Sequence, residues 1–349
     1  MRKYKIAVIF GGCSPEYEVS LQSAYSVISH MDNSKYDPIL LGITQSGEWF
    51  RFIGSPEKIK ENTWHNSDHC VKAIISPDRE THGVLVFDKS GINSIKLDAA
   101  FPVIHGKNGE DGTLQGLFAL AGIPVVGCNP LASALCMDKD KAHKIAGSAG
   151  IKIPRSFILK CNADAFALGQ QAEKLGYPLF VKPVNAGSSF GITKVLSKDE
   201  LPAAVRLASG YDDEIIVEEN IQGFEVGCAV LGNDSLIVGE LDEVELSDGF
   251  FDYKEKYSLE TSSIHVPARI PTEITQRAKK TAETLYKSLG CTGFARVDMF
   301  ITPSGEIVFN EVNTIPGFTF HSRYPNMLKA IGMTFEQVID AAIGLAVGT

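Results

Sequence analysis

Short apolar runs and amphipathic helix patterns alternate along the first part of the chain. Residues 5–10 (KIAVIF) and 99–104 (AAFPVI) are continuous apolar runs, which are typical of strands buried on both faces of a sheet. Gly11 and Gly12 follow the first run and precede a helical pattern over residues 18–31. This order predicts an α/β unit with a parallel sheet. Further predicted features are strands at 38–43 and 123–126, a helix at 113–121, and a polar, irregular stretch at 54–81.

The pattern changes in the second part of the chain. One amphipathic helix is predicted over residues 133–149, and Gly150 and Pro154 punctuate its end, which indicates a domain boundary near 130–150. From residue 178 onward short strands follow one another closely. The predicted strands are 179–183, 192–195, 214–219, 224–231 and 236–244, and the predicted later helices are 273–289 and 334–346.

A hairpin near the C-terminus organises this second part. Strands at 296–301 and 306–312 are joined by Thr-Pro-Ser-Gly, a turn-forming set. A four-residue loop would place Ile301 opposite Glu306 and Arg296 opposite Glu311. Alternation along each strand then separates a polar face from an apolar one. The polar face holds Arg296, Asp298, Glu311 and Asn313, and the apolar face holds Val297, Met299, Ile301, Val308 and Val312.

The polar face of the hairpin concentrates negative charge. Two carboxylates a few Å apart repel by about 4 kcal/mol at an effective dielectric near 20. A cation, a proton or open solvent must relieve that repulsion. Two carboxylates with an amide carbonyl are ligands that suit Mg²⁺, so Asp298, Glu311 and Asn313 are candidate metal ligands. The alternative is the polar outer face of an ordinary hairpin.

Composition narrows the class of protein. The 349 residues suffice for two or three domains, and 44% apolar with 21% charged residues is usual for globular proteins. A net charge of −9 argues against nucleic acid or an anionic membrane as a general partner. The seven cysteines form no CxxC pair, which fits a reducing compartment. Neither a signal peptide nor a membrane span is predicted, so we expect a cytoplasmic protein.

Four segments carry candidate chemistry beyond the hairpin. The glycine turn before Glu16 and the loop 105–112 (HGKNGEDG) both follow apolar strands, where ligands of parallel sheets bind. The loop 187–191 (GSSFG) offers donors suited to phosphate, and Lys182 lies in the strand beside it. The charged, aromatic stretch 251–257 is typical of a lid. Plain turns, a capping histidine and a flexible hairpin are the alternatives for these segments.

Taken in order, these segments resemble the D-alanine–D-alanine ligase family of the ATP-grasp ligases. The resemblance covers nearly the whole chain. Two details resemble the D-alanine–D-serine ligases of vancomycin resistance. His321-Ser322-Arg323 stands where common relatives carry His-Ser-Leu, and Lys256-Tyr257 is kept where D-lactate ligases carry a histidine. The motifs that carry the resemblance are GGCSPEYEVS (11–20), HGKNGEDG (105–112), MDK (137–139), VKPVNAGSSFG (181–191), EKY (255–257), RVDMF (296–300) and NEVNTIPGFTFHSRYP (310–325).

The resemblance implies an α/β ATP-grasp fold in three parts. These are an N-terminal Rossmann-like parallel-sheet domain at 1–130, a central ATP-grasp subdomain with the phosphate loop at 131–224, and a C-terminal subdomain with the lid and metal site at 225–349. It implies that ATP phosphorylates a first D-alanine, and that the amino group of a second D-amino acid attacks the acyl phosphate. D-alanine, D-serine and ATP would be the substrates, for peptidoglycan precursors and vancomycin resistance, and a homodimer is implied.

The resemblance also assigns roles to individual residues. Two Mg²⁺ ions, which Mn²⁺ can replace, would be held by Asp298, Glu311 and Asn313. Glu16 and His105 would bind the first D-alanine, Arg296 and the Gly317 N–H would stabilise the oxyanion, and Ser322 would bind the second carboxylate. Tyr257 and Ser188 would bond Glu16 and close the lid. Residues expected at ATP are Lys139, Lys182, Ser188, Ser189, Glu218, Ile221, Glu225 and Lys256.

The choice of second substrate is assigned to Arg323, with Phe251 as a neighbour, because a serine hydroxyl needs a hydrogen-bond partner that alanine does not. The alternative is an arginine exposed on a rim. Glu219-Asn220 departs from the Lys and aromatic residue of many relatives, so adenine contacts there would be through the backbone. Two rival functions remain: a housekeeping D-alanine–D-alanine ligase, and a non-catalytic ATP-binding regulator on the same scaffold.

Overall fold

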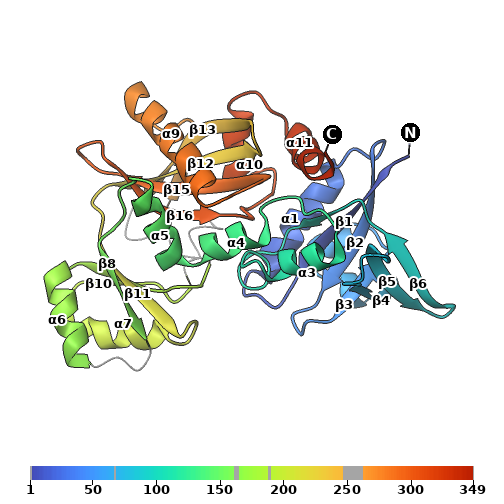
Figure 1. The fold of residues 1–349 in the computed structure, drawn as a ribbon, viewed down its shortest axis with the longest axis horizontal. Helices are drawn as coiled ribbons and strands as arrows, with labels where there is room; N and C mark the ends of the chain where they lie inside the picture. Colours follow the sequence, from blue (N-terminus) through green and yellow to red (C-terminus); the bar gives the residue numbers. More distant parts are fainter. Residues whose placement is uncertain (1, 67, 161–164, 188–189, 247–261, 349) are drawn as a thin grey trace.

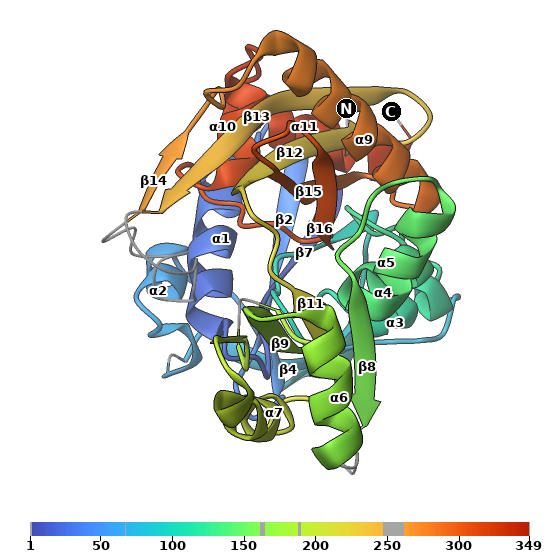
Figure 2. The same cartoon turned by 90° about the vertical axis from the view of Figure 1, so that its left-hand side faces the viewer.

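Three β-sheets with helices packed on them make up the protein (Figure 1). The computed structural model describes residues 2–348 except 67, 161–164, 188–189 and 247–261. The fold is the mixed α/β architecture expected from the sequence. The first sheet lies at one end of the molecule in Figure 1, and the third sheet lies above the second in both views (Figures 1 and 2).

The first sheet has seven strands in the order β6-β5-β4-β3-β2-β1-β7. Among the described strands, β1 pairs in parallel with β2 on one side and with β7 on the other. The expectation of a parallel sheet is therefore wrong for β3 to β6, which form an antiparallel meander. The strands are β1 Tyr4–Gly11, β2 Tyr36–Ile43, β3 Trp49–Phe52, β4 Cys70–Ile75, β5 Gly83–Asp88, β6 Gly91–Lys96 and β7 Ala99–Pro102.

The stretch 54–81 is not the irregular surface segment that its polarity predicts. It contains helix α2 (Glu57–Lys60), the 3₁₀ turn η1 (Trp64–Asn66) and strand β4. Trp64 has no exposed surface, and its ring packs edge-on against Phe10 of β1. A single large aromatic residue anchors the stretch to the core of the first sheet, which a window of mostly polar residues hides.

Helices α1 (Tyr17–His30) and α3 (Thr113–Ala121) form as predicted. The predicted strand at 123–126 is wrong, because only Val125 pairs there, in a single bridge to Ala100. The predicted helix 133–149 is two helices, α4 (Pro130–Met137) and α5 (Lys139–Ser148). Asp138 breaks the pattern: its backbone is extended, and its carboxylate accepts a hydrogen bond from the Lys141 N–H as the cap of α5.

The second sheet has four strands in the order β10-β9-β11-β8 and is antiparallel throughout. Its apolar face is covered by α6 and α7, and both lie on the side away from the third sheet (Figure 2). Its elements are β8 Ser156–Lys160, α6 Ala165–Leu175, β9 Leu179–Pro183, β10 Thr193–Val195, η2 Lys198–Glu200, α7 Leu201–Ala208 and β11 Glu214–Glu219.

The third sheet has five strands in the order β14-β13-β12-β15-β16. The last two helices, α10 and α11, pack with α1 and with residues of this sheet into one apolar core, and α11 lies beside α1 in Figure 1. The elements are β12 Phe224–Gly232, β13 Leu236–Leu246, β14 Ser262–His265, α9 Thr272–Ser288, β15 Phe294–Ile301, β16 Ile307–Asn313, α10 Arg323–Lys329 and α11 Phe335–Val347. None of the helices among the described residues is long and apolar enough to cross a membrane.

The C-terminal hairpin forms, but its register differs from the expected one. Asp298 lies opposite Glu311 and Met299 lies opposite Phe309, so Asn310 is an extra residue in β16. Such a bulge shifts the alternation of the strand by one. Phe309 therefore joins the apolar core on the same face as Val312, and Val308 is fully buried as well. The predicted pairs Ile301–Glu306 and Arg296–Glu311 are wrong, whereas the shared polar face is correct because Arg296 lies opposite Asn313.

Candidate active site

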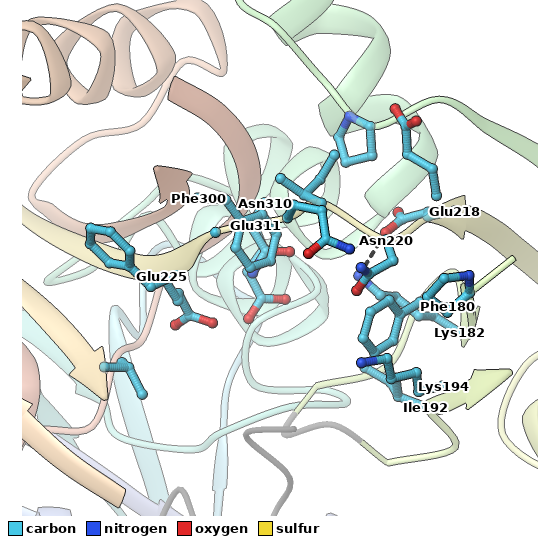
Figure 3. A pocket seen from close by; sticks show the side chains of 18 of the residues that line it. Phe180, Lys182, Ile192, Lys194, Glu218, Asn220, Glu225, Phe300, Asn310 and Glu311 are labelled. Carbon is cyan, nitrogen blue, oxygen red and sulfur yellow. Dashed lines mark ion pairs between the residues drawn. The ribbon is translucent and has the colours of Figure 1, made fainter. Parts of the chain in front are cut away.

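A cavity of about 480 Å³ lies between the second and third sheets (Figure 3). Its walls come from β9, β10 and β11 on one side and from β12, β13, β15 and β16 on the other. This size is in the range of pockets for small organic ligands. Every described residue that the sequence places at ATP lines it: Lys139, Lys182, Glu218, Ile221 and Glu225.

Positive charge is held at the second sheet by buried partners. Lys182 on β9 pairs with Glu218 on β11, with 2.6 Å between Nζ and Oε2 (dashed in Figure 3). Burial opposes the charge of Glu218, but the positive charge of Lys182 outweighs it and lowers the pKa of the carboxyl. Lys139, at the first turn of α5, donates to the Ala186 carbonyl at 2.6 Å. Glu218 is thus the buried counter-ion of Lys182, which lines the cavity.

The predicted metal ligands meet at the third sheet. Asp298 has 1% of its surface exposed and accepts hydrogen bonds from Arg296 Nη2 at 2.7 Å and from Asn313 Nδ2 at 2.8 Å. Glu311 lies opposite Asp298 in the ladder and faces the cavity. No group of three His, Cys, Asp or Glu side chains in the described ranges converges as a metal site. Two carboxylates with an amide still fit Mg²⁺, which needs few protein ligands.

Arg323 is buried rather than exposed on a rim, so the alternative reading of that residue is wrong. Its side chain is 8% exposed and contacts three acids. Nε and Nη2 donate to Asp242 at 2.7 and 2.9 Å, and Nη1 donates to Glu225 at 2.9 Å. Nη2 also lies 3.6 Å from Asp298. The arginine therefore links the metal-ligand face to the cavity wall that carries Glu225.

Glu16 lies where three loops meet. It stands at the N-terminal end of α1 and is 5% exposed. A methyl group added at Gly106 would come within 2.5 Å of its Oε2, and one at Gly187 within 3.2 Å. The turn 11–16, the loop 105–112 and the glycine loop therefore converge on one carboxylate. A side chain at Gly106 would have to displace the carboxylate, and one at Gly187 would crowd it.

His105 joins the same centre to the loop after β16. Its Nδ1 donates to the Ile315 carbonyl at 2.9 Å, so the neutral ring accepts at Nε2 from the Ser23 hydroxyl, 3.1 Å away. Burial lowers the pKa of His105, against the raising effect of Glu16. The neutral imidazole is therefore favoured beside the Glu16 carboxylate.

Glu110 is a second buried acid in this loop. Its two carboxylate oxygens accept from the Gly106 and Ile315 N–H groups at 2.8 and 3.0 Å. Burial and then the charge of Glu16 raise its pKa to about 8. The loop after Ile315 turns at Gly317, where an added Cβ would lie 3.0 Å from Ser322 Oγ. Glu110 therefore ties the loop 105–112 to the start of the segment after β16.

Part of the expected site lies outside the described residues. These are Ser188 and Ser189 of the glycine loop, and Phe251, Lys256 and Tyr257 of the expected lid. The structure also adds three residues that the sequence did not single out. Asp242 is hidden in an ordinary strand, Glu110 in a loop noted for its glycines, and Asn310 reaches the cavity only because of the bulge. Gly227 leaves room for Arg323 and Asp242, but this role of the glycine can be recognised only in the structure.

Comparison with known proteins agrees with this geometry. Residues 5–128 match the model described as D-ala D-ala ligase N-terminus, and residues 148–344 match D-ala D-ala ligase C-terminus. The chain belongs to the D-alanine–D-alanine ligase family. It is accordingly an ATP-dependent ligase.

Individual relatives within the family fall in two groups. The vancomycin B-type resistance protein VanB of Enterococcus faecalis is 46% identical, with 99% of each chain covered. A D-alanine–D-alanine ligase of Caldicellulosiruptor bescii is 42% identical, with 99% of this chain and 96% of the relative covered. The crystal structure of the VanG D-Ala:D-Ser ligase from E. faecalis has 59% identity and a TM-score of 0.92, with 99% of this chain and 100% of that chain covered. This family member is thus similar both to resistance ligases and to D-alanine–D-alanine ligases.

Proposed function

We propose that the protein joins D-alanine to D-serine at the expense of ATP, for peptidoglycan precursors that confer vancomycin resistance. The carboxylate of D-alanine would take the γ-phosphoryl group of ATP, and the amino group of D-serine would displace phosphate from the acyl phosphate. The observation that carries this proposal is the cavity lined by Lys139, Lys182 and Glu311, with Asp298 opposite Glu311 in the hairpin.

Each part of the site would perform one task. Glu16 would bind the ammonium group of D-alanine, because it is a buried carboxylate with close backbone around it. Lys139 and Lys182 would bind phosphates. Arg296 and the Gly317 N–H would stabilise the oxyanion of the tetrahedral intermediate, and Ser322 would bind the carboxylate of the second substrate. Holding both amino acids beside ATP supplies about 7–11 kcal/mol of the barrier through proximity.

Asp298, Glu311 and Asn313 would hold two Mg²⁺ ions, for which Mn²⁺ can substitute. When bound, these ions neutralise charge on the transferring phosphoryl group. Arg296 supports this role, since it already balances the charge of Asp298 at 2.7 Å. The buried arginine and the amide of Asn313 keep the carboxylate oriented toward the Glu311 side of the hairpin.

The preference for D-serine rests on similarity to the VanG structure and on Arg323. That arginine follows Ser322 directly and is fixed by Asp242 and Glu225. A closed site that satisfies a hydroxyl group discriminates strongly against the analogue without one. The nearest rival is a D-alanine–D-alanine ligase, because the second substrate depends on few residues.

One competition experiment decides between the two amino acids. The protein is supplied with ATP, Mg²⁺, D-alanine and equimolar D-serine, and the dipeptides are separated and identified by mass spectrometry. D-alanyl-D-serine as the main product is expected. A main product of D-alanyl-D-alanine would overturn the assignment of D-serine while leaving the ligase reaction in place.

Measuring phosphate release from ATP distinguishes the ligase from a non-catalytic regulator on the same scaffold. The ligase releases phosphate from ATP only when D-alanine is present, whereas a regulator would show the same rate with or without amino acids.

We also propose that two copies associate, as the family implies. Light scattering coupled to size-exclusion chromatography would give a dimer mass if this is correct and a monomer mass if it is not.

A further inference from the structure

His143 on α5 is a buried side chain that the proposed reaction does not use. The residue is 3% exposed, and its Nε2 lies 2.9 Å from the Asn310 carbonyl of β16. A carbonyl oxygen can only accept, so Nε2 carries the hydrogen. In the neutral ring, Nδ1 then has a lone pair and no hydrogen. The contact with Asn310 therefore fixes the tautomer.

The other ring nitrogen faces an acceptor. Nδ1 lies 3.6 Å from Oε1 of Glu218, and both atoms are buried without a hydrogen-bond partner. Two lone pairs directed at each other across that gap repel, and two buried orphans in one place are uncommon in folded proteins. A proton on Nδ1 would convert the repulsion into a charge-assisted hydrogen bond. The position is thus built for a second protonation state of the imidazole.

The protonated state of His143 becomes favourable when Lys182 changes its partner. In this structure Glu218 has one strong cationic partner, Lys182, at 2.6 Å from its Oε2. The same lysine lines the cavity where the proposed function places nucleotide phosphate. When Lys182 turns toward phosphate, Glu218 is left as a buried charge with a weakened partner, which is strongly unfavourable. Lys182 and Lys139 also act on the Glu218 carboxylate that faces the ring, and β16 contributes the Asn310 carbonyl and the Phe309 ring.

We propose that His143 is a positioning residue for the nucleotide and takes a proton from solvent onto Nδ1 when Lys182 engages phosphate. The imidazolium then replaces Lys182 as the partner of Glu218, and it stays bonded to the Asn310 carbonyl next to Glu311. Nucleotide binding at one sheet is thereby linked to the orientation of the strand that carries the metal ligands. This inference rests on the proposed function, because it requires a nucleotide in the cavity.

The linkage has a direct thermodynamic signature. Binding that raises the population of a protonated group takes up protons from the buffer, and it tightens as the pH falls through the range in which histidine titrates, about pH 5 to 8. Isothermal titration calorimetry with ADP and Mg²⁺, repeated in PIPES and in Tris, gives the number of protons from the difference in heat. The variant His143→Gln keeps a donor for the Asn310 carbonyl but cannot carry the charge. The control is His69→Gln, an exposed histidine in the turn before β4.

We expect net proton uptake by the wild-type protein and by His69→Gln, and a loss of most of it in His143→Gln, with weaker ADP binding in that variant. ADP binding by the wild type with no proton uptake overturns the role of His143 alone, as does equal uptake by His143→Gln. Absence of ADP binding by the wild type overturns the proposed function together with this inference. If His143→Gln fails to fold, the number of protons that the wild-type protein takes up on binding ADP still tests the proposal.

Discussion

Asp242 and Arg323 form a buried two-point ion pair between β13 and α10. The two carboxylate oxygens accept from Nε at 2.7 Å and from Nη2 at 2.9 Å. Asp242 has no exposed surface, and the Gly227 N–H also donates to its Oδ1 at 2.7 Å. A side chain at Gly227 would come within 2.7 Å of both partners. The pair therefore fixes the helix that begins directly after Ser322 to the third sheet.

Removing one member of this pair should destabilise the fold. Asp242→Ala leaves a buried guanidinium without its main partner, which typically lowers the free energy of unfolding by about 3–5 kcal/mol. Urea denaturation followed by circular dichroism measures it. Glu173→Ala is the matched control, because its pair with Lys198 is exposed and should contribute about 1 kcal/mol or less. Equal losses in the two variants would contradict a structural role for Asp242.

Arg323 should also govern the choice of second substrate. Arg323→Leu removes the donor proposed for the serine hydroxyl, so the ratio of D-alanyl-D-serine to D-alanyl-D-alanine should fall by at least about tenfold. The competition assay described above measures that ratio. The double variant Asp242→Leu/Arg323→Leu replaces the ion pair by an apolar pair, which often restores stability.

The two variants separate selectivity from folding. We expect the double variant to regain stability and keep the altered ratio. Arg269→Leu, at the half-exposed arginine of the cavity wall, should leave the ratio unchanged. A wild-type ratio in both Arg323 variants would place selectivity elsewhere in the site.

Elements with a strong local pattern could be predicted from the sequence. The strands 179–183 and 214–219 and the helix 113–121 have the observed bounds, because each combines an apolar run with clear stops. The shared polar face of the hairpin was also correct. Two of the failures each depend on a single residue. The extra Asn310 shifts the register of β16, and Asp138 divides one predicted helix into two.

Contacts between distant segments could not be predicted from the sequence. Nothing in the pattern of β13 distinguishes Asp242 from the acids beside it, and its role appears only where α10 crosses the sheet. Glu110 lies in a motif that the sequence did reveal, yet its bond to the Ile315 N–H depends on a loop 205 residues away. Such pairings are set by the tertiary fold, not by local propensity.

Substitution of Trp64 tests whether this residue anchors the polar stretch 54–81 to the core. Its ring is fully buried, lies within 2.4 Å of where a Cβ at Gly42 would be, and donates from Nε1 to the Tyr17 hydroxyl at 3.1 Å. Trp64→Ala should lower the free energy of unfolding by about 3–5 kcal/mol through the cavity it leaves. Trp49→Ala, at a half-buried position of β3, should cost clearly less. Similar urea midpoints for the two variants would show that residues 54–81 are not anchored by Trp64.

Glu110 predicts how stability depends on pH. Its pKa is about 8 in the folded protein, raised first by burial and then by Glu16, against an ordinary value near 4.5. Between those values the folded state binds more protons than the unfolded state. The free energy of unfolding should therefore fall as pH rises from about 5 to about 8, by at most about 1.4 kcal/mol per pH unit from this group.

Urea titrations at several pH values measure that slope. Glu110→Gln cannot titrate, so its decline over the same range should be shallower than that of the wild type. Glu80→Gln removes an exposed acid and should keep the wild-type slope. If Glu110→Gln and the wild type fall in parallel, the raised pKa is not the source of the pH dependence.

Glu311 tests the candidate metal site itself. The bulge at Asn310 places Glu311 opposite Asp298 and toward the cavity, where its charge would hold an ion against the phosphates. Glu311→Gln keeps the size of the side chain and an oxygen, so the fold should persist. Turnover should fall by about 10²–10³, the effect of losing one electrostatic contact in the transition state.

Glu306→Gln, at the exposed far end of the hairpin where Glu306 pairs with Lys152, should leave turnover unchanged. Because a weakened ion site can be refilled, the assay is repeated over a range of Mg²⁺ concentrations. Full turnover of Glu311→Gln at saturating Mg²⁺ would confine its role to affinity for the ion, and full turnover at every concentration would remove it from the site.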